Sequence, residues 1–395
     1  MKTITILGAT GSIGQQTLSV LATQREAYRV FALTAKSNIS QLLPLCLAHR
    51  PQYVVLTEEH AAQEMRAQIK AHALPTEVLS GPQALIDVAI HPDVDYVMAA
   101  IVGAVGLPPT LAAAQHKKRI LLANKEALVM SGQLFMDAVK NANAELLPVD
   151  SEHNALFQCL TPSLSAATKS VKKLWLTASG GPFLARDFAS LDHVTPDEAC
   201  RHPNWAMGRK ISVDCATMVN KALEIIEARW LFDIPADNVD VVIHPQSVVH
   251  SLVEYLDGSI LGLLAHPDMR IPIAYALAWP ERIVSGAPNL DLLTQGGSLS
   301  FSPPDLTRFP VLSLVRDVLA TGGTAPAIFN AANEVAVAAF LEKRLRFTDI
   351  VHTIGETLSS LPASTAMDLP NILAADHEAR RVTSQLLKTR QEAYV

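Results

Sequence analysis

The feature that most constrains the fold is a glycine-rich turn that begins at the eighth residue. Gly8, Gly11 and Gly14 follow a short apolar segment, Thr3–Leu7, and open a helical pattern, Ile13–Thr23. Glycines at such a corner let the backbone approach a pyrophosphate, and the following helix offers unpaired N–H groups and a positive dipole end. The spacing is G-x-x-G-x-x-G rather than G-x-G-x-x-G. The turn therefore predicts nucleotide binding, with a plain strand–turn–helix corner as the alternative.

The first 149 residues alternate short apolar strands with helical stretches such as Glu58–Lys70. This alternation is typical of a doubly wound parallel sheet that helices cover on both faces, and loops at the carboxyl edge of such a sheet bind ligands. The predicted strands are Thr3–Leu7, Val30–Thr34, Tyr53–Leu56, Tyr96–Ala100, Arg119–Leu122 and Glu145–Val149. We therefore expect a Rossmann-like nucleotide-binding domain over residues 1–149.

The pattern changes after residue 149. Residues 150–284 mix predicted helices and β-strands and form the expected α+β catalytic domain; residues 285–304, rich in Gly, Ser, Pro and Asn, are the expected linker; residues 305–395 are predicted to be helical. The predicted elements of the middle domain are helices His153–Leu160 and Ala216–Leu231, strands Leu174–Ala178, Val239–Ile243, Val248–Tyr255 and Ser259–Leu264, and a loop Arg201–Lys210. The C-terminal helices are predicted at Val311–Ala320, Ile328–Leu341, Thr348–Ser359 and Ala375–Thr389.

The charge and the cysteine content of the chain exclude several classes of protein. The formal charge is 32 − 38 = −6, with no basic face of the kind that nucleic acid binding needs. The four cysteines form neither a C-x-x-C pair nor a zinc-finger spacing, so free thiols in the cytoplasm are expected. The uncharged segment Val97–Ala114 approaches the length of a membrane span, but Gly103, Gly106, Pro108 and Pro109 interrupt it. We expect a strand, a turn and a helix there, and no membrane association.

The loop after the second predicted strand indicates which dinucleotide is bound. Enzymes that use NAD place a carboxylate here, about 20 residues after the glycines, on the ribose hydroxyls. This chain has Lys36, Ser37 and Asn38 instead. A cation, a hydroxyl and an amide suit a 2′-phosphate, so the sequence favours NADP(H). An exposed lysine without a ligand is the alternative.

Carboxylates in two places could hold a metal ion. Asp150 and Glu152 follow a predicted strand, and Glu224 shares one helix face with Asn220, with Lys221 beside them. Oxygen ligands of this kind suit Mg²⁺. A helix cap at Asp150 and a surface ion pair between Lys221 and Glu224 are the plainer alternatives.

Taken together, these segments resemble the 1-deoxy-D-xylulose 5-phosphate reductoisomerase family. The resemblance runs in collinear order from the third residue to the C-terminal helices, and it rests on residues 6–14, 123–128, 148–155, 177–183, 202–210, 218–224, 243–247 and 330–334. A set of eight ordered segments is far more specific than any one of them.

The resemblance implies roles for individual residues. It makes Asp150, Glu152 and Glu224 the ligands of Mg²⁺ or Mn²⁺ and, with Lys125, the catalytic set. It implies that the sugar phosphate contacts Lys125, Ser151, Glu152, Ser179, His202, Trp205, Met207, Cys215, Asn220, Lys221 and Glu224. It implies NADPH contacts at Gly8, Thr10, Gly11, Ser12, Ile13, Lys36, Ser37, Asn38, Asn124, Glu126 and Gly208.

The reaction implied is a skeletal rearrangement of 1-deoxy-D-xylulose 5-phosphate followed by NADPH reduction to 2-C-methyl-D-erythritol 4-phosphate, in non-mevalonate isoprenoid synthesis. The family also implies a homodimer formed through residues 239–264 and a loop, residues 201–210, that closes over the substrate. Two alternatives are a plain NADP-dependent sugar-phosphate oxidoreductase and a nucleotide-sensing protein without catalysis. This chain departs from the family pattern at Lys36-Ser37, where Gly-Lys is common, and at Cys215, where a serine is usual.

Overall fold

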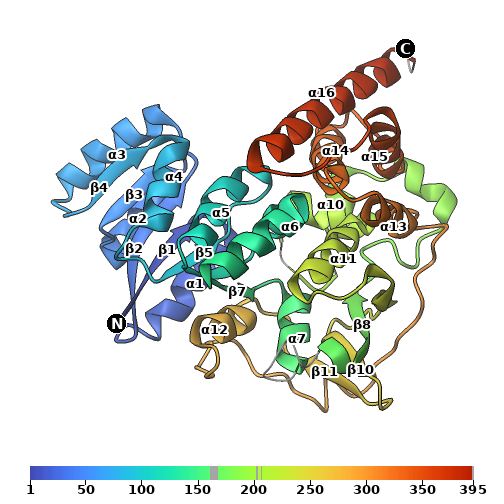
Figure 1. The fold of residues 1–395 in the computed structure, drawn as a ribbon, viewed down its shortest axis with the longest axis horizontal. Helices are drawn as coiled ribbons and strands as arrows, with labels where there is room; N and C mark the ends of the chain where they lie inside the picture. Colours follow the sequence, from blue (N-terminus) through green and yellow to red (C-terminus); the bar gives the residue numbers. More distant parts are fainter. Residues whose placement is uncertain (161–167, 202, 206, 394–395) are drawn as a thin grey trace. The chain divides into compact units, whose positions relative to one another are not determined.

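The computed structural model describes residues 1–160, 168–201, 203–205 and 207–393. The chain divides into two units, and neither is one continuous stretch (Figure 1). Unit 1 comprises residues 1–127, 135–154 and 268–288, and unit 2 comprises residues 128–134, 155–267 and 289–395. Helix α6 (Lys125–Ala142) and helix α7 (Ser151–Cys159) therefore contribute residues to both units.

Unit 1 is built on a seven-stranded parallel sheet in the order β4-β3-β2-β1-β5-β6-β7. Its strands are β1 (Lys2–Leu7), β2 (Tyr28–Ala35), β3 (Tyr53–Leu56), β4 (Glu77–Ser80), β5 (Tyr96–Ala99), β6 (Arg119–Leu122) and β7 (Glu145–Pro148). The strand order reverses between β1 and β5. This reversal is the point at which open parallel sheets bind ligands, and the glycine turn follows β1 there.

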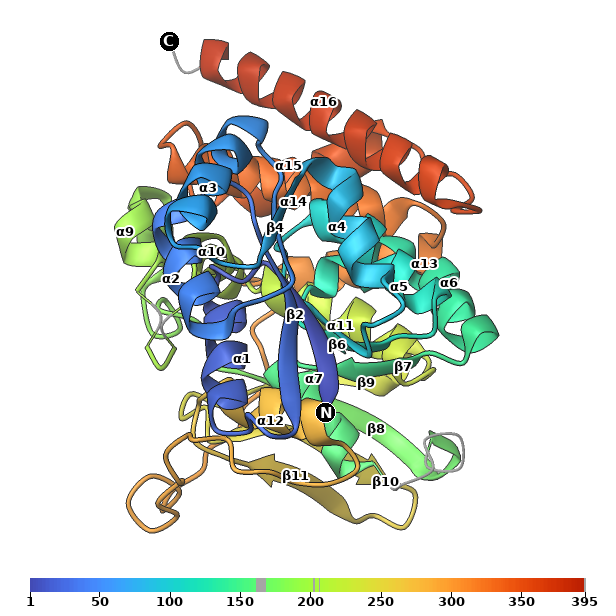
Figure 2. The same cartoon turned by 90° about the vertical axis from the view of Figure 1, so that its left-hand side faces the viewer.

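Helices cover both faces of this sheet (Figure 2). The helices on the face of the first crossovers are α1 (Ser12–Ala22), α2 (Ile39–His49) and α3 (Glu59–Ala71), and α12 (Arg270–Ala278) packs beside α1. The helices on the other face are α4 (Gly81–Ile90) and α5 (Leu107–Gln115), the latter preceded by the short helix η1 (Ala104–Gly106). Ile4, Ile6 and Leu33 have no exposed surface between these layers, and each such burial stabilises the fold by roughly 1.5–3 kcal/mol.

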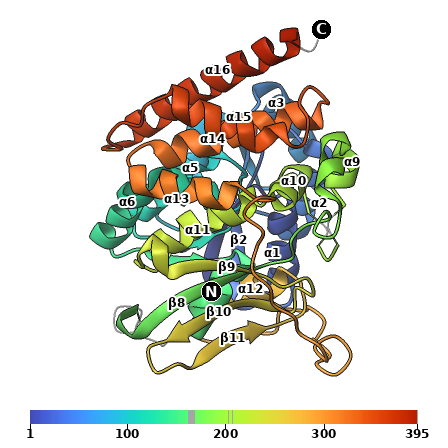
Figure 3. The same cartoon turned by 90° about the vertical axis from the view of Figure 1, so that its right-hand side faces the viewer.

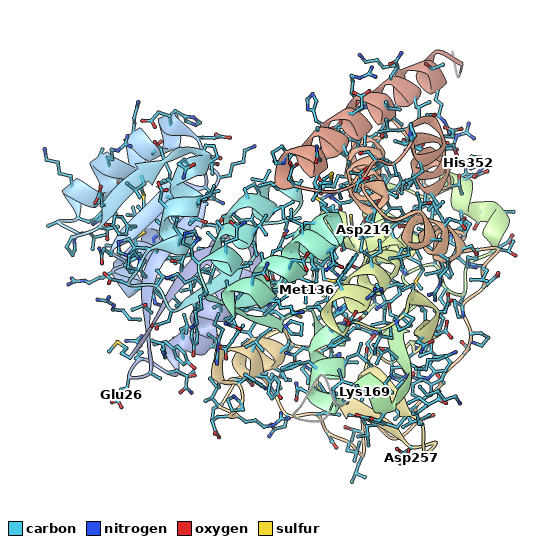
Figure 4. The ribbon with its side chains drawn as sticks, in the orientation of Figure 1. Glu26, Met136, Lys169, Asp214, Asp257 and His352 are labelled. Atoms are coloured by element: carbon cyan, nitrogen blue, oxygen red, sulfur yellow. The ribbon has the colours of Figure 1, made fainter. Side chains whose placement is uncertain are left out.

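Unit 2 combines a four-stranded sheet with a bundle of helices (Figure 3). The sheet has the order β11-β10-β8-β9 and is formed by β8 (Val171–Ala178), β9 (Val239–Ile243), β10 (Val249–Tyr255) and β11 (Ile260–Leu264). The pair β8–β9 is parallel, and the other two pairs are antiparallel. Asp257 lies at the tip of the β10–β11 hairpin, where Gly258 has a φ of +88° (Figure 4).

The helices of unit 2 pack on this sheet and on one another. Helix α11 contacts β8 and β9 on one side and α10, α13 and α14 on the others, while α14, α15 and α16 lie side by side (Figure 3). The longer helices are α10 (Arg209–Thr217), α11 (Val219–Leu231), α13 (Val311–Thr321), α14 (Ala325–Leu341), α15 (Asp349–Ser360) and α16 (Leu369–Ala393). The short ones are η2 (Thr168–Ser170), η3 (Phe188–His193), α9 (Pro196–Ala199) and η4 (Ala236–Asn238).

The predicted Rossmann-like sheet and the helical C-terminal region are confirmed, with local corrections. Strand β4 was not predicted, because it is a four-residue edge strand in which no residue is fully buried. The predicted helix Ala216–Leu231 is broken, since Met218 has a φ of 63° between α10 and α11. The segment Val97–Ala114 forms β5, η1 and α5, as expected. Within the described residues, no helix combines the length and apolarity needed to cross a membrane.

Candidate functional site

The glycine turn of unit 1 leaves no room for a side chain at Gly8 or Gly14. Gly8 has a φ of +84°, and a Cβ atom there would lie 2.7 Å from the carbonyl oxygen of Ala100, at the end of β5. A Cβ at Gly14 would lie 2.5 Å from the carbonyl oxygen of Gly8. Gly11 immediately precedes α1, so no side chain caps the first N–H groups of that helix. The backbone here is therefore compact and presents donors around Thr10, Ser12 and Ile13, as an anion site requires.

Residues 36–38 follow β2 at the same edge of the sheet. The Lys36 ammonium is exposed and lies 3.5 Å from a carboxylate oxygen of Glu58, a residue that follows β3. Asn38 caps α2 by accepting a hydrogen bond of 3.2 Å from the backbone N–H of Gln41. The loop of Lys36, Ser37 and Asn38 itself contains no carboxylate, but Glu58 places a carboxylate beside Lys36. Glu58 was not predicted to lie here, although its position two residues after a parallel strand was a usable signal.

Asn124 joins two loops at the carboxyl edge of the same sheet. Its side-chain oxygen accepts from the backbone N–H of Ala127 at 3.0 Å and so caps α6. Its amide nitrogen donates to the carbonyl oxygens of Ile101 and Gly103, and to a carboxylate oxygen of Glu126 at 3.2 Å. These bonds fix the loop that follows β5 next to the start of α6. The two predicted NADPH contacts, Asn124 and Glu126, are both buried.

A buried ion pair joins Lys125 to Asp150. The Lys125 and Asp150 side chains are only 7% and 11% exposed, and His153 Nδ1 lies 3.8 Å from the second carboxylate oxygen. Burial alone would raise the pKa of Asp150, but the nearby Lys125 ammonium and the His153 ring hold that pKa well below its usual range. Ser151 Oγ donates to a carboxylate oxygen of Glu152 at 2.6 Å. Asp150 is therefore ionised at neutral pH, and the carboxylate of Glu152 lies two residues further along the chain.

His153 was not predicted to belong to this group. It is wholly buried and lies one helical turn after Asp150 in α7. The i, i+3 spacing of Asp150 and His153 was the signal that could have revealed it.

In unit 2, Ser179 begins a turn that packs closely on α10. Gly180 and Gly181 have φ values of +82° and +71°, and Gly181 N–H donates to Ser179 Oγ at 3.2 Å. A Cβ at Gly181 would lie 3.0 Å from the carbonyl oxygen of Cys215. Two residues that the resemblance assigns to phosphate binding, Ser179 and Cys215, thus come from adjacent segments of unit 2.

The first turns of α11 carry a buried polar cluster. Asn220, Lys221 and Glu224 are 9%, 3% and 1% exposed. Asn220 Nδ2 donates to one Glu224 carboxylate oxygen at 2.5 Å, and the Lys221 ammonium pairs with the other. The surface ion pair that sequence analysis kept as the alternative is therefore wrong for Lys221 and Glu224, because both side chains are buried. A buried carboxylate held by an amide and an ammonium is costly and typical of a functional site.

The loop between α9 and α10 carries Trp205, Met207 and Gly208. Trp205 and Met207 are partly buried, and Gly208 is exposed at the start of α10. The Trp205 and His250 rings meet edge to face at 6.0 Å. Asn204, to which the sequence assigned no contact, donates to the carbonyl oxygen of Pro245 and to Ser247 Oγ, both at 2.8 Å. The predicted substrate contact His202 lies outside the described residues.

The donor set fits a hard divalent cation. Within unit 1, Asp150 and Glu152 offer carboxylate oxygens, and the depressed pKa of Asp150 keeps a negative charge available.

Comparisons with known proteins agree with these features. A family model for 1-deoxy-D-xylulose 5-phosphate reductoisomerase matches residues 4–132, and models for C-terminal domains of the same enzyme match residues 146–232 and 264–382. The reductoisomerase of Ralstonia nicotianae is 56% identical over 96% of this chain and 97% of its own length. That of Stutzerimonas stutzeri is 57% identical over 97% of each chain.

Solved structures give the same result. A crystal structure of DOX-P reductoisomerase in complex with NADPH, fosmidomycin and magnesium has a TM-score of 0.93 and 44% identity, covering 98% of both chains. The Zymomonas mobilis enzyme in complex with NADPH has a TM-score of 0.91 and 43% identity, covering 98% of this chain and 99% of its own. On both sequence and fold, the chain belongs to the 1-deoxy-D-xylulose 5-phosphate reductoisomerase family.

Proposed function

We propose that this protein converts 1-deoxy-D-xylulose 5-phosphate to 2-C-methyl-D-erythritol 4-phosphate, with NADPH as reductant and Mg²⁺ or Mn²⁺ as cofactor, in non-mevalonate isoprenoid biosynthesis. The observation that carries the proposal is that the chain combines three features. Two are buried ion pairs between a lysine and a carboxylate, Lys125–Asp150 and Lys221–Glu224, and the third is a glycine turn at the switch point of a parallel sheet. Family membership at 56% identity over nearly the whole chain supports it.

Unit 1 binds the dinucleotide. The N–H groups around Gly11, Ser12 and Ile13 receive the pyrophosphate, and Lys36, Ser37 and Asn38 receive the 2′-phosphate. Asn124 and Glu126 hold the loop after β5 and orient the nicotinamide end. Bound NADPH supplies the hydride that reduces the aldehyde. The complexes of solved family members with NADPH support this assignment.

Asp150, Glu152 and Glu224 are the proposed metal ligands. A divalent cation held by them supplies charge stabilisation for oxygens that become negative during the rearrangement. Lys125 and Ser151 contact the oxygen-bearing carbons of the substrate. The Lys125 ammonium, already buried beside Asp150, can donate a hydrogen bond to a substrate oxygen as charge develops there.

The phosphate of the substrate is the proposed ligand of Ser179, Cys215, Asn220 and Lys221, with His202 as a further substrate contact. Binding this remote group keeps the two fragments of the retro-aldol step in place until they rejoin, so recombination stays effectively unimolecular. Trp205, Met207 and Gly208 belong to the loop that closes over the substrate and the nicotinamide and excludes water during hydride transfer.

One assay tests the proposal. NADPH oxidation is followed with 1-deoxy-D-xylulose 5-phosphate in the presence of Mg²⁺ and, separately, of EDTA, and the product is identified by NMR. We expect oxidation that EDTA abolishes and a branched carbon skeleton. A linear reduced sugar phosphate would instead establish the plain NADP-dependent oxidoreductase. NADPH binding without oxidation would establish a nucleotide-sensing protein.

The proposed assembly is a cytoplasmic homodimer formed through residues 239–264. Support comes from β11, an edge strand on which Ile260, Leu261 and Leu264 are 54%, 48% and 39% exposed. Exposed apolar edge strands need covering, because unpaired backbone groups and apolar faces promote association. Light scattering at micromolar concentration should give twice the chain mass of 42.6 kDa, and a monomeric mass would contradict the assignment.

A further inference from the structure

A buried histidine of unit 2, His244, is bonded to two other segments of the chain through its ring. Its Nε2 accepts hydrogen bonds from the backbone N–H groups of Val248 at 3.2 Å and Val249 at 3.1 Å. Its Nδ1 lies 2.9 Å from the carbonyl oxygen of Ser300. Because a carbonyl oxygen can only accept, Nδ1 carries the hydrogen, and one tautomer satisfies both ends of the ring. We call residues 244–248, which this ring closes, the docking turn.

The bond to Ser300 ties the docking turn to the end of the segment that was predicted to be a linker. The His244 and Phe301 rings stack at 4.8 Å with an interplanar angle of 17°. Ile243 and Ser302 exchange two backbone hydrogen bonds of 2.8 and 3.0 Å. Residues 300–302 therefore act as a strap that holds His244 in position.

The backbone of His244 connects the docking turn to the proposed phosphate site. Its N–H donates to the carbonyl oxygen of Ala178 at 2.7 Å, and Ala178 directly precedes Ser179. The docking turn and the Ser179 turn thus leave the ends of two paired strands, β9 and β8, side by side.

Asn204 belongs to the loop that carries Trp205, here called the tryptophan loop, and it contacts this turn. Asn204 Nδ2 donates to Pro245 O and to Ser247 Oγ, both at 2.8 Å, and these acceptors belong to the docking turn. Ser247 has a φ of 53°, a conformation that the bonds within the turn must hold in place. The position of the two acceptors therefore depends on the bonds that His244 makes.

We propose that His244 is a positioning residue for the tryptophan loop. It holds the docking turn in the shape that receives Asn204, beside the Ser179 turn, and so stabilises the state in which the loop covers the sugar phosphate. His244 itself contacts no substrate in this scheme. The inference rests on the proposed function, since that function places the substrate next to Ser179.

Three variants separate the contributions of the His244 ring, of its hydrogen bonds and of the Asn204 contact. His244→Phe keeps an aromatic ring to stack on Phe301 but loses both polar ends, His244→Gln keeps an acceptor and a donor, and Asn204→Ala removes the docking contact. His352→Phe is the matched control, because His352 is an exposed histidine on α15 (Figure 4).

Steady-state kinetics give the first test. His244→Phe should raise KM for 1-deoxy-D-xylulose 5-phosphate and lower kcat, each by about fivefold, the effect of roughly one lost hydrogen bond. His244→Gln should recover at least half of both effects, and the NADPH Kd should not change. The double variant His244→Phe with Asn204→Ala should be no worse than either single variant, because both act through the same contact. Additive effects would overturn the proposal.

Limited proteolysis gives a second test that does not depend on activity. Trypsin should cut after Arg201, which is exposed, faster in His244→Phe and in Asn204→Ala than in the wild type or in His352→Phe. Unchanged cutting in both variants would overturn the proposal. If His244→Phe does not fold, the same test of additivity is made with His244→Gln, Asn204→Ala and their double variant. A wild type that leaves 1-deoxy-D-xylulose 5-phosphate unchanged would refute the proposed function, whereas an active wild type with additive variants would refute the role of His244 alone.

Discussion

Asn333 of α14 donates a hydrogen bond of 2.9 Å to the carboxylate of Asp214 in α10, although the two residues are 119 positions apart in the sequence. Both side chains are buried, and Lys210 pairs with the other carboxylate oxygen of Asp214 at 2.9 Å. Helix α10 also carries Cys215. The C-terminal helices of unit 2 therefore hold the helix that carries one of the proposed phosphate contacts.

Removing this bond should destabilise unit 2. Asn333→Ala leaves a buried carboxylate with one partner fewer, and the loss of a hydrogen bond to a charged group should lower the free energy of unfolding by about 2–3 kcal/mol. Asn371→Ala, at an exposed position of α16, is the control and should change little. Urea unfolding followed by circular dichroism measures both, and equal midpoints for the two variants would contradict the assignment.

The metal ligands should be indispensable for catalysis. Asp150→Asn keeps the shape of the side chain but removes a negative ligand, so kcat should fall roughly a thousandfold or more, with similar losses for Glu152→Gln and Glu224→Gln. Asp87→Asn, on an exposed position of α4, should retain full activity. Near-normal turnover of Asp150→Asn at saturating Mg²⁺ would end the assignment of this ligand.

The loop after β2 should select NADPH over NADH. Lys36→Glu places a second carboxylate beside Glu58 and removes the cation proposed for the 2′-phosphate, so the NADPH Kd should rise about tenfold while that of NADH changes little. Lys70→Glu, exposed on α3, is the matched control. Fluorescence titration measures both constants. A wild type that uses NADH as efficiently as NADPH would show that this loop has been misinterpreted.

Cys215 should limit affinity for the sugar phosphate. A thiol donates a weaker and longer hydrogen bond than a hydroxyl, so Cys215→Ser should lower KM by about fivefold, or ~1 kcal/mol, with kcat nearly unchanged. Substrate should also protect Cys215 from iodoacetamide. Cys200→Ser serves as the control thiol, since Cys200 contacts the backbone of Arg209 rather than the Ser179 turn. If the serine variant binds no better and protection is absent, Cys215 is not at the phosphate site.

Alkaline conditions should reveal a contribution of Cys46 to stability. Burial raises the pKa of the Cys46 thiol from 9.0 to about 12. The folded state therefore keeps a proton that the unfolded state releases, and this contribution is full below pH 9 and is lost as the pH rises from 9 towards 12. In that range the wild type should lose roughly 1.4 kcal/mol per pH unit more than Cys46→Ala. Parallel pH profiles for the two proteins would contradict this.

Sequence patterns determined much of the fold of unit 1. Strands β3 and β6 were predicted to the residue, because fully buried parallel strands are continuous apolar runs bounded by turns. The glycine turn was equally readable, since Gly8 and Gly14 are required where a Cβ would meet neighbouring backbone. Signals of this kind come from residues that are close together in the sequence, so they can be recognised without a structure. The edge strand β4 has no such signal, because none of its four residues is fully buried.

Tertiary packing decided what the polar residues do. Lys221 and Glu224 could have been a surface pair; only the packing of α11 against the sheet and the helices around it makes them a buried site. No role was assigned to His244 and Asn204 from the sequence, because their partners at Ser300 and Pro245 lie 56 and 41 residues away. Residue identity fixes which hydrogen bonds a side chain can make, whereas long-range contacts fix which of them it does make. The sequence therefore determined the fold class and the chemistry available to it, and the tertiary structure decided which groups are buried together.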